Sequence, residues 1–433
     1  MDLAIAIGGG VLFFLLILAS IALHEVGHMV PAKLFGVRVP QYFVGFGPTL
    51  WSTKRGETEY GIKWIPLGGY VRLLGMYPGR QDIKPFRGTL GSRIQRLADG
   101  AREAEWADIR PEDDGRLFYQ KKTWQKLIVM AGGPMMNILL AFFIFWGIAG
   151  IHGNYRPQTT VAVVQTCVIR ADATDRTCPP GEPKNPTPAY AAGLKVGDKV
   201  VSFNGVEIRS WPQLGELIRA NGDREARIVV QRTGQRVDLV PVHTLITGVA
   251  DKWDPGKRIP AGWLGVSPQY ALVKGGPVEV VGDMWDMSAA SMVALAQFPV
   301  KVYNVAADMI QGKPRDVYGP MSIIGASVTA GDVAKSNLAV EDKLVLFATL
   351  LGAVNLFVAL FNFVPLLPLD GGHIAGALYE GARRGLARLL RRPDPGVVDT
   401  AKMLPVAYGV GAFILLSGAV LIIADIVSPL RLF

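Results

Sequence analysis

Four long apolar runs dominate the pattern of hydrophobic and polar positions along the chain. They cover roughly residues 4–23, 127–150, 344–367 and 405–427. Each is close to the ~20 residues that an α-helix needs to cross the hydrocarbon layer of a bilayer. The pattern therefore predicts a polytopic α-helical membrane protein with about four transmembrane helices. The first run lacks a basic segment before it and exceeds the usual length of the apolar core of a signal peptide, so we interpret it as a retained membrane helix.

Strand-like patterns occur in the first segment between these runs. Within 37–74, aromatic, aliphatic and glycine residues alternate as in the strands of a hairpin, whereas 80–118 is polar and charged. Open strands cannot face lipid. We therefore expect a membrane-associated β-hairpin region that packs on protein or lines a wet cavity.

The segment between the second and third runs predicts a separate, mostly β domain. Strand-like runs at 199–203 and 226–231 are joined to turns at Asn204-Gly205 and Thr233-Gly234, with one helical stretch at 211–220. Such a domain covers about 158–245.

An amphipathic pattern follows this domain. Apolar residues recur every three or four positions from Met292 to Met309, interrupted by Pro299, which predicts a bent helix that lies along the membrane or against the outer domain. A fifth crossing is disfavoured by the charges of Asp286, Lys301 and Asp308.

The distribution of Lys and Arg predicts the orientation, because cytoplasmic loops are enriched in both near membrane helices. Residues 31–126 contain 17 of them, whereas 151–342 contain 20 in twice the length. Basic residues recur between the third and fourth runs, at Arg383, Arg384, Arg388, Arg391, Arg392 and Lys402. Four crossings with both termini outside, and with 31–126 in the cytoplasm, agree with the distribution of Lys and Arg in every loop.

Composition narrows the class further. Fifty glycines and 29 prolines without a period exclude collagen-like, coiled-coil and solenoid proteins. Two cysteines exclude a cysteine-built zinc module and a disulfide scaffold. Cys167 and Cys178 lie in the outer segment, where they can form one disulfide in an oxidising compartment; two free thiols are the alternative.

The inner end of the first run carries the strongest chemical motif, His24-Glu25-Val26-Gly27-His28. On a helix, positions i and i+4 share a face, so His24 and His28 can bind one metal ion. Glu25 then projects beside the ion to act on a water molecule. Ordinary polar groups at a helix end are the alternative, but three ionisable groups inside an apolar run are costly without a partner.

Catalytic zinc needs a third protein ligand and an open position. Asp370 ends the third run on the same inner side as His24, and its carboxylate is a suitable oxygen ligand. Pro365, Pro368 and the following glycines would break the helix and let this group bend inward. His373 is the alternative ligand, and otherwise a supporting residue.

These motifs together resemble those of the site-2 protease family of intramembrane zinc metalloproteases. The pairing of H-E-x-x-H with a later N-x-x-P-x-x-x-L-D-G, which begins at Asn362, carries the resemblance. Further stretches agree with it: Gly133-Pro134-Met135-Met136-Asn137, Pro66-Leu67-Gly68-Gly69-Tyr70-Val71, Tyr318-Gly319-Pro320-Met321-Ser322-Ile323, and the segment from Ala191 to Gly205, which is similar to bacterial PDZ domains. The chain looks most like the bacterial regulators that cut membrane-anchored anti-sigma factors, in a version with one PDZ domain.

The resemblance implies a role for each motif. His24, His28 and Asp370 would hold Zn²⁺, and Glu25 would be the general base. Asn362 and the turn at Gly68 and Gly69 would hold an extended substrate strand, since a membrane helix must unwind before hydrolysis. Asn355 and Asn137 are weaker candidates, which can instead join neighbouring helices by hydrogen bonds.

The resemblance also implies partners and a location. We expect single-span membrane proteins of the anti-sigma type as substrates, the lipid bilayer as the surroundings, and no nucleic acid. The location would be the bacterial inner membrane, with the PDZ-like domain extracytoplasmic and the active site toward the cytoplasm. The PDZ-like domain can either bind a peptide as an added strand or act as a bulky gate, and we favour the gate.

Two other classes of function compete with a protease. A non-catalytic membrane scaffold that displays a PDZ-like domain would need neither Glu25 between the two histidines nor Asp370 on the same membrane face. A metal transporter would spread its ligands across the membrane depth, whereas these cluster at one end of their helices. The protease interpretation is therefore preferred.

The expected organisation, in chain order, has nine parts: 1–30, the first membrane helix with H-E-x-x-H; 31–80, the membrane-associated β-hairpin region; 81–126, a polar cytoplasmic segment; 127–150, the second membrane helix; 158–245, the PDZ-like α+β domain; 246–342, a connecting segment with an amphipathic helix; 343–373, the third membrane helix with L-D-G; 374–404, a cytoplasmic loop; and 405–427, the fourth membrane helix.

Overall fold

The structure of the 433-residue chain is a computed structural model that describes residues 2–79, 99–100, 102–103, 105–168, 178, 185–254 and 256–429. Much of the predicted polar segment, residues 80–98 with 101 and 104, lies outside the described residues. The chain divides into two compact units. The first contains Met1–Trp146 and Val280–Phe433, and the second contains Gly147–Glu279.

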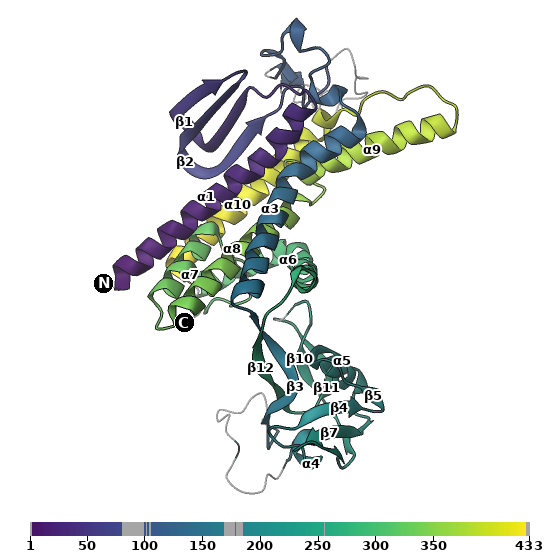
Figure 1. The fold of residues 1–433 in the computed structure, drawn as a ribbon. Coiled ribbons are helices and arrows are strands. Elements are labelled where there is room, and N and C mark those ends of the chain that lie inside the picture. The colour runs from purple at the N-terminus through teal and green to yellow at the C-terminus, as the bar shows by residue number, and fades with distance from the viewer. Residues whose placement is uncertain are drawn as a thin grey trace. The chain divides into compact units, whose positions relative to one another are not determined.

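The first unit is mainly helical, with one β-hairpin (Figure 1). Its elements, two of which continue into the second unit, are α1 (Asp2–Leu34), β1 (Gln41–Arg55), β2 (Thr58–Arg72), α3 (Thr123–Ile151), α6 (Pro277–Gln311), α7 (Ile323–Lys335), α8 (Val340–Asn362), α9 (Asp370–Leu389) and α10 (Leu404–Val427), with one-turn 3-10 helices at Pro111–Asp113, Phe118–Gln120 and Thr400–Met403.

Four of these helices are long and apolar enough to cross a membrane: α1, α3, α8 and α10, the last counted from Thr400. They confirm the four membrane helices that the apolar runs predicted. Helix α1 continues past its apolar run to Leu34, so the H-E-x-x-H motif lies within the same helix. Apolar side chains such as Leu12 and Leu15 on α1 are more than half exposed, as lipid-facing side chains are.

Glycine contacts allow α1 to approach α3 closely. A Cβ on Gly27 would lie 2.3 Å from the Gly132 carbonyl oxygen, and a Cβ on Gly132 would lie 2.0 Å from the Gly27 carbonyl oxygen. No side chain fits in either place, so the backbones themselves are in contact. This crossing places the histidine face of α1 directly against α3.

The hairpin packs beside α1. Strands β1 and β2 pair antiparallel, and Tyr42 on β1 donates a hydrogen bond to the Ala22 carbonyl oxygen of α1 over 2.8 Å. The pairing is irregular between Val44 and Trp51, where Gly45 has a φ of +90° that side chains rarely adopt. The β-rich region that the sequence predicted here is present, and β2 faces the histidine end of α1.

The second unit is a β-rich domain with two short helices. Its elements are β3 (Asn154–Val164), α4 (Pro188–Ala191), β4 (Lys199–Phe203), β5 (Val206–Glu207), α5 (Trp211–Asn221), β6 (Glu225–Ala226), β7 (Ile228–Arg232), β8 (Gln235–Asp238), β9 (Val242–His243), β10 (Leu245–Ala250), β11 (Arg258–Trp263) and β12 (Val266–Val273).

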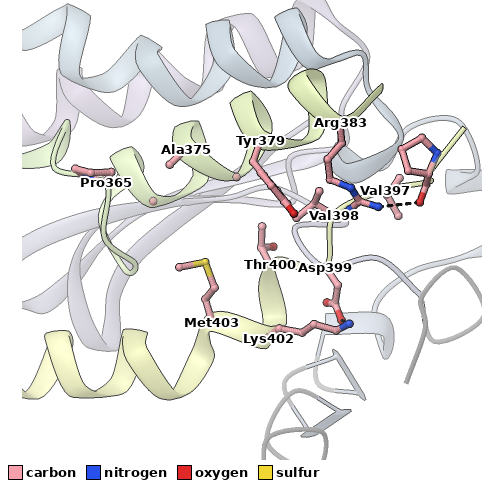
Figure 2. A pocket seen from close by; sticks show the side chains of 13 residues that line it. Pro365, Ala375, Tyr379, Arg383, Val397, Val398, Asp399, Thr400, Lys402 and Met403 are labelled. Carbon is pink, nitrogen blue, oxygen red and sulfur yellow. Dashed lines mark hydrogen bonds and ion pairs between the residues drawn. The ribbon is translucent and has the colours of Figure 1, made fainter. Parts of the chain in front are cut away.

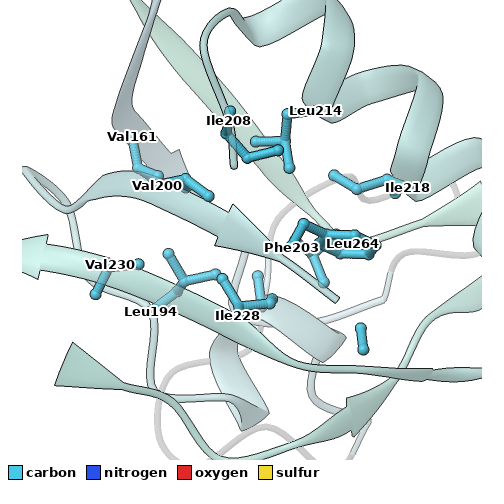
Figure 3. Close-up of a cluster of buried hydrophobic side chains, with 12 residues drawn as sticks. Val161, Leu194, Val200, Phe203, Ile208, Leu214, Ile218, Ile228, Val230 and Leu264 are labelled. Atoms are coloured by element: carbon cyan, nitrogen blue, oxygen red, sulfur yellow. The ribbon is translucent and has the colours of Figure 1, made fainter. Parts of the chain in front are cut away.

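One sheet with the strand order β12-β3-β4-β7-β8 organises this unit, and β5 pairs with β4. Figure 3 shows Phe203 of β4, Ile228 of β7 and Leu214 of α5 meeting in its buried core. Cys167 and Cys178 form a disulfide, which is the first of the two alternatives that the sequence left open.

The structure differs from the expectation in the segments assigned as connections. Within 246–342, β12 pairs with β3 and therefore belongs to the sheet of the second unit. Pro268 interrupts the alternating pattern of β12 and coincides with an irregularity in the register. For this reason the sequence pattern did not predict a strand here.

Two helices also depart from the expectation. Within 374–404, expected to be a loop, the structure has most of α9. Helix α6, expected along the membrane or against the outer domain, contains Pro299 and packs Val302 and Val305 against Leu421 and Ala424 of α10.

Candidate metal centre

His24 and His28 come from one face of α1 and are both buried. The Nδ1 of His28 lies 2.8 Å from the Val129 carbonyl oxygen of α3. Since a carbonyl oxygen only accepts, Nδ1 must carry the proton and donate it. The Nε2 of His28 is then left with its lone pair, which is the form that binds a metal.

Gly133 of α3 leaves the space that the two imidazoles occupy. A Cβ at this position would lie 2.2 Å from the His28 Nε2 and 2.7 Å from the His24 Nε2. Any other residue would therefore overlap the donor atoms of both histidines. Gly133 begins the stretch Gly133–Asn137 that resembles a motif of the family, but the sequence alone did not indicate that Gly133 contacts the two histidines.

The third membrane helix ends just before the third donor. Helix α8 stops at Asn362, and after seven residues Asp370 begins α9. The turn is tight, because a Cβ on Gly371 would lie 2.2 Å from the Val364 carbonyl oxygen. This break brings the Asp370 carboxylate to the two histidines, as the prolines and glycines of the sequence predicted.

The three donor atoms form a nearly equilateral triangle. The Asp370 Oδ2 lies 3.3 Å from the Nε2 of His24 and 3.3 Å from the Nε2 of His28, and the two Nε2 atoms are 3.3 Å apart. A tetrahedral zinc ion with bonds of about 2.0 Å holds its ligand atoms about 3.3 Å apart, so the spacing fits zinc.

An unsatisfied polar atom supports the same interpretation. Among the described residues, the Asp370 Oδ2, which is one of the three donor atoms, is buried without a hydrogen-bond partner. Buried polar groups are seldom left so without a functional reason. Asp370 rather than His373 completes this cluster, although His373 lines the same cavity.

The triangle opens into a cavity of about 440 Å³. Its wall includes every site residue that the sequence predicted, namely His24, Glu25, His28, Gly68, Gly69, Asn362 and Asp370. It also includes residues that were not singled out, among them Ile21, Leu73, Met76, Met130 and Val358. Apolar spacing alone could not separate these from lipid-facing or core positions.

Strand β2 lies directly against Glu25. A Cβ on Gly69 would be 3.3 Å from the Cγ of Glu25 and 3.1 Å from the Phe43 carbonyl oxygen. Gly68 has a φ of +106°, and a Cβ there would meet the ring of Phe46 at 2.7 Å. The two glycines therefore expose a bare stretch of backbone along the cavity wall.

The two weaker asparagine candidates have different surroundings. Asn355 joins α8 to α1, because its Nδ2 donates to the Ser20 Oγ over 3.2 Å and to the Leu351 carbonyl oxygen over 2.9 Å. Asn137 instead lines the cavity and is only 1% exposed. Its Oδ1 has no hydrogen-bond partner among the described residues.

Comparisons with known proteins agree with this chemistry. A family model described as Peptidase family M50 matches residues 12–389. The chain is 33% identical to the zinc metalloprotease Rip1 of Mycolicibacterium smegmatis over 437 residues, which cover 98% of each protein. It is also 33% identical to Rip1 of Mycobacterium tuberculosis, again over 98% of each, and 28% identical to the metalloprotease MmpA of Caulobacter vibrioides over 84% of each.

Proposed function

The chain belongs to peptidase family M50, the site-2 protease family, and is a zinc metalloprotease; from this premise we propose which of its residues carry out the hydrolysis. The observation that carries the proposal is the triangle of donor atoms, with Glu25 and the bare backbone of β2 in the same cavity. A scaffold would need no such arrangement.

Three side chains would hold the metal, and a fourth would move the proton. His24, His28 and Asp370 are the ligands, and zinc, when bound, supplies Lewis-acid polarisation of the scissile carbonyl. The carboxylate of Glu25 takes a proton from the attacking water as general base. The same carboxyl then gives this proton to the amine nitrogen that leaves, so the residue returns to its starting state.

The substrate would lie along β2 as an extended strand. A membrane helix satisfies its own backbone hydrogen bonds, so it must unwind before a peptide bond can be cut. The unwound strand needs new partners for its N–H and C=O groups, and the backbone at Gly68 and Gly69 can supply them by β-strand addition. Asn362, at the end of α8, supplies a side-chain amide on the cavity wall.

The orientation and the outer domain complete the proposal. Basic residues near the start of α3 and before α10 support a cytoplasmic active site. The disulfide between Cys167 and Cys178 supports an oxidising compartment for the second unit. We interpret this unit as a PDZ-like domain that acts as a gate, in a protein of the bacterial inner membrane.

The proposed substrates are single-span membrane proteins of the anti-sigma type. Such proteins carry one transmembrane helix and a folded outer part that an earlier cut would have to remove before a gate could admit them. The gate and the substrate class are tested together, by comparing substrates with and without their outer parts.

Cleavage in reconstituted membranes tests the catalytic proposal. The wild type should cut members of a panel of single-span substrates, and a zinc chelator should stop it. Glu25→Gln should keep one zinc per chain but lose activity by a factor of at least ~10². Glu57→Gln is the matched control, since Glu57 lies in the exposed hairpin turn and pairs only with Arg116 among the described residues. Cleavage by Glu25→Gln at the wild-type rate would refute the assignment.

A further inference from the structure

Helix α9 is amphipathic and leaves one apolar face uncovered. Along its 20 residues, Leu378, Leu386 and Leu389 fall on the same side, and they are 54%, 57% and 79% exposed. Figure 1 shows α9 extending away from the other helices of the first unit. A row of exposed leucines of this length is unusual for a surface in water.

The opposite side of α9 is fixed to the protein. Glu380 is 3% exposed and forms an ion pair with Lys126 of α3 over 2.9 Å. Arg384 pairs with Asp394, which lies beyond the helix, over 3.4 Å. Arg383 donates to the Pro395 carbonyl oxygen over 3.1 Å, across a cavity of about 520 Å³ between α9 and residues 395–403 (Figure 2). These contacts hold the helix in one rotation, so its leucine face points away from the protein.

A cluster of arginines flanks the leucine face at its far end. Arg388, Arg391 and Arg392 are exposed, and none of them has an ion pair among the described residues. Asp394, two residues further, pairs with Arg384 and not with these three arginines, whose guanidinium groups lie beside leucines that avoid water. A helix with one apolar face and basic residues at its border is the pattern of a helix that lies in a membrane interface.

The chain places α9 at the surface of the membrane. The spanning helix α8 ends at Asn362, and the next span begins at Thr400. Both ends must lie at the same face of the bilayer, so the 37 residues between them, 363–399, leave and re-enter there. Helix α9 occupies most of this excursion.

We propose that α9 lies in the interface next to the active site and binds anionic lipid headgroups through Arg388, Arg391 and Arg392. The leucine face enters the boundary between headgroups and acyl chains, and the arginines attract negative lipids. Each basic residue near a negative membrane surface strengthens the binding of its segment to that surface about fivefold, and salt screens this attraction. Since α9 begins at Asp370, the lipid surface would also steady the element that carries a proposed zinc ligand.

The experiment uses a fluorescent label on the full-length protein in lipid vesicles. The only two cysteines of the chain form a disulfide, so Leu389→Cys creates a single reactive thiol. The labelled protein is reconstituted in phosphatidylcholine alone or with added phosphatidylglycerol, and lipids with a nitroxide near the headgroup act as quenchers. Pro393→Cys, four residues further and beyond the helix, is the matched control position.

The proposal predicts that the label at position 389 is blue-shifted and quenched by nitroxide lipids, whereas the label at 393 stays in water. Quenching at 389 should increase severalfold with phosphatidylglycerol, and high salt should remove that increase. Combining the label with Arg388→Gln, Arg391→Gln and Arg392→Gln should abolish the dependence on phosphatidylglycerol while the zinc content stays at wild type.

Two results would overturn the proposal. A label at position 389 that remains in water in both vesicles would show that the leucine face does not enter the interface. Equal quenching with and without phosphatidylglycerol would refute recognition of anionic headgroups by the arginines. Both readouts are independent of protease activity, so neither depends on the catalytic proposal.

Discussion

Replacing Gly133 with alanine tests how tightly α3 shapes the metal centre. The added Cβ would lie 2.2 Å from the His28 Nε2, whereas ordinary contacts begin at 3.4 Å. The imidazole would have to move by the difference, about 1.2 Å, which far exceeds the ~0.2 Å tolerance of a zinc site. His28 cannot move freely, because its Nδ1 donates a hydrogen bond to the Val129 carbonyl oxygen. Helix α3 cannot easily rotate to carry the new Cβ away from His28, because the backbone of Gly132 is in contact with that of Gly27.

We therefore expect Gly133→Ala to weaken zinc binding by at least ~10–100-fold and to lower cleavage in proportion to the zinc lost. The assay measures zinc per purified chain over a series of free-zinc concentrations. Gly147→Ala is the matched control, since it lies in the same helix with nothing within 4 Å of its added Cβ. It should keep full zinc and gain up to ~1 kcal/mol of helix stability. Wild-type zinc affinity in Gly133→Ala would refute the reasoning.

Three further changes have definite outcomes. Arg315→Ala should lower the free energy of unfolding in detergent by ~3–5 kcal/mol, because it leaves the Asp425 carboxylate buried without its ion pair. Lys335→Ala, which breaks a more exposed ion pair with Asp332, should lower the free energy of unfolding by less than ~1 kcal/mol. Burial raises the pKa of Glu105 to about 7, despite hydrogen bonds from backbone amides after β2. Its stabilising contribution is therefore complete below about 4.5 and is lost as the pH rises through about 7, and Glu105→Gln should flatten the pH dependence of the melting temperature across that range. Asn137→Ala should raise KM or lower kcat severalfold with zinc retained, because its buried side-chain oxygen lines the cavity without a hydrogen-bond partner among the described residues; unchanged kinetics with lower stability would instead assign it to helix packing.

The parts of the fold and site that the sequence predicted correctly depend on local patterns. The four membrane helices follow from run length, and the pairing of His24 with His28 follows from helix geometry. The placement of Asp370 follows from prolines and glycines that end a helix. Each of these signals lies within one stretch of about 20 residues or fewer, so it can be identified without knowing which distant segments are in contact.

The parts that the sequence did not predict depend on contacts between distant segments. The contact of Gly133 with two imidazoles arises only when α1 and α3 cross. Asn137 and Asn355 both lie in apolar helices, yet one faces a cavity and the other bonds to Ser20. Their roles differ because of which helix lies opposite.

Helix α9 was missed for a different reason. Glycines and arginines separate its apolar residues, so the segment resembled a basic loop rather than a helix. Its apolar residues share a face once they are placed on a helical wheel of about 3.6 residues per turn. Such a helix becomes apparent once its boundaries are known, because the pattern is diluted when the window extends into the neighbouring loop.

Zinc X-ray absorption of the purified wild type, compared with Asp370→Ala, tests the assignment of His24, His28 and Asp370 as the zinc ligands. We expect nitrogen and oxygen neighbours at about 2.0–2.1 Å with two imidazole rings in the wild type, and the loss of one oxygen and most of the bound zinc in Asp370→Ala. Three imidazoles around zinc that Asp370→Ala leaves unchanged would refute this assignment and would identify His373 as the third ligand.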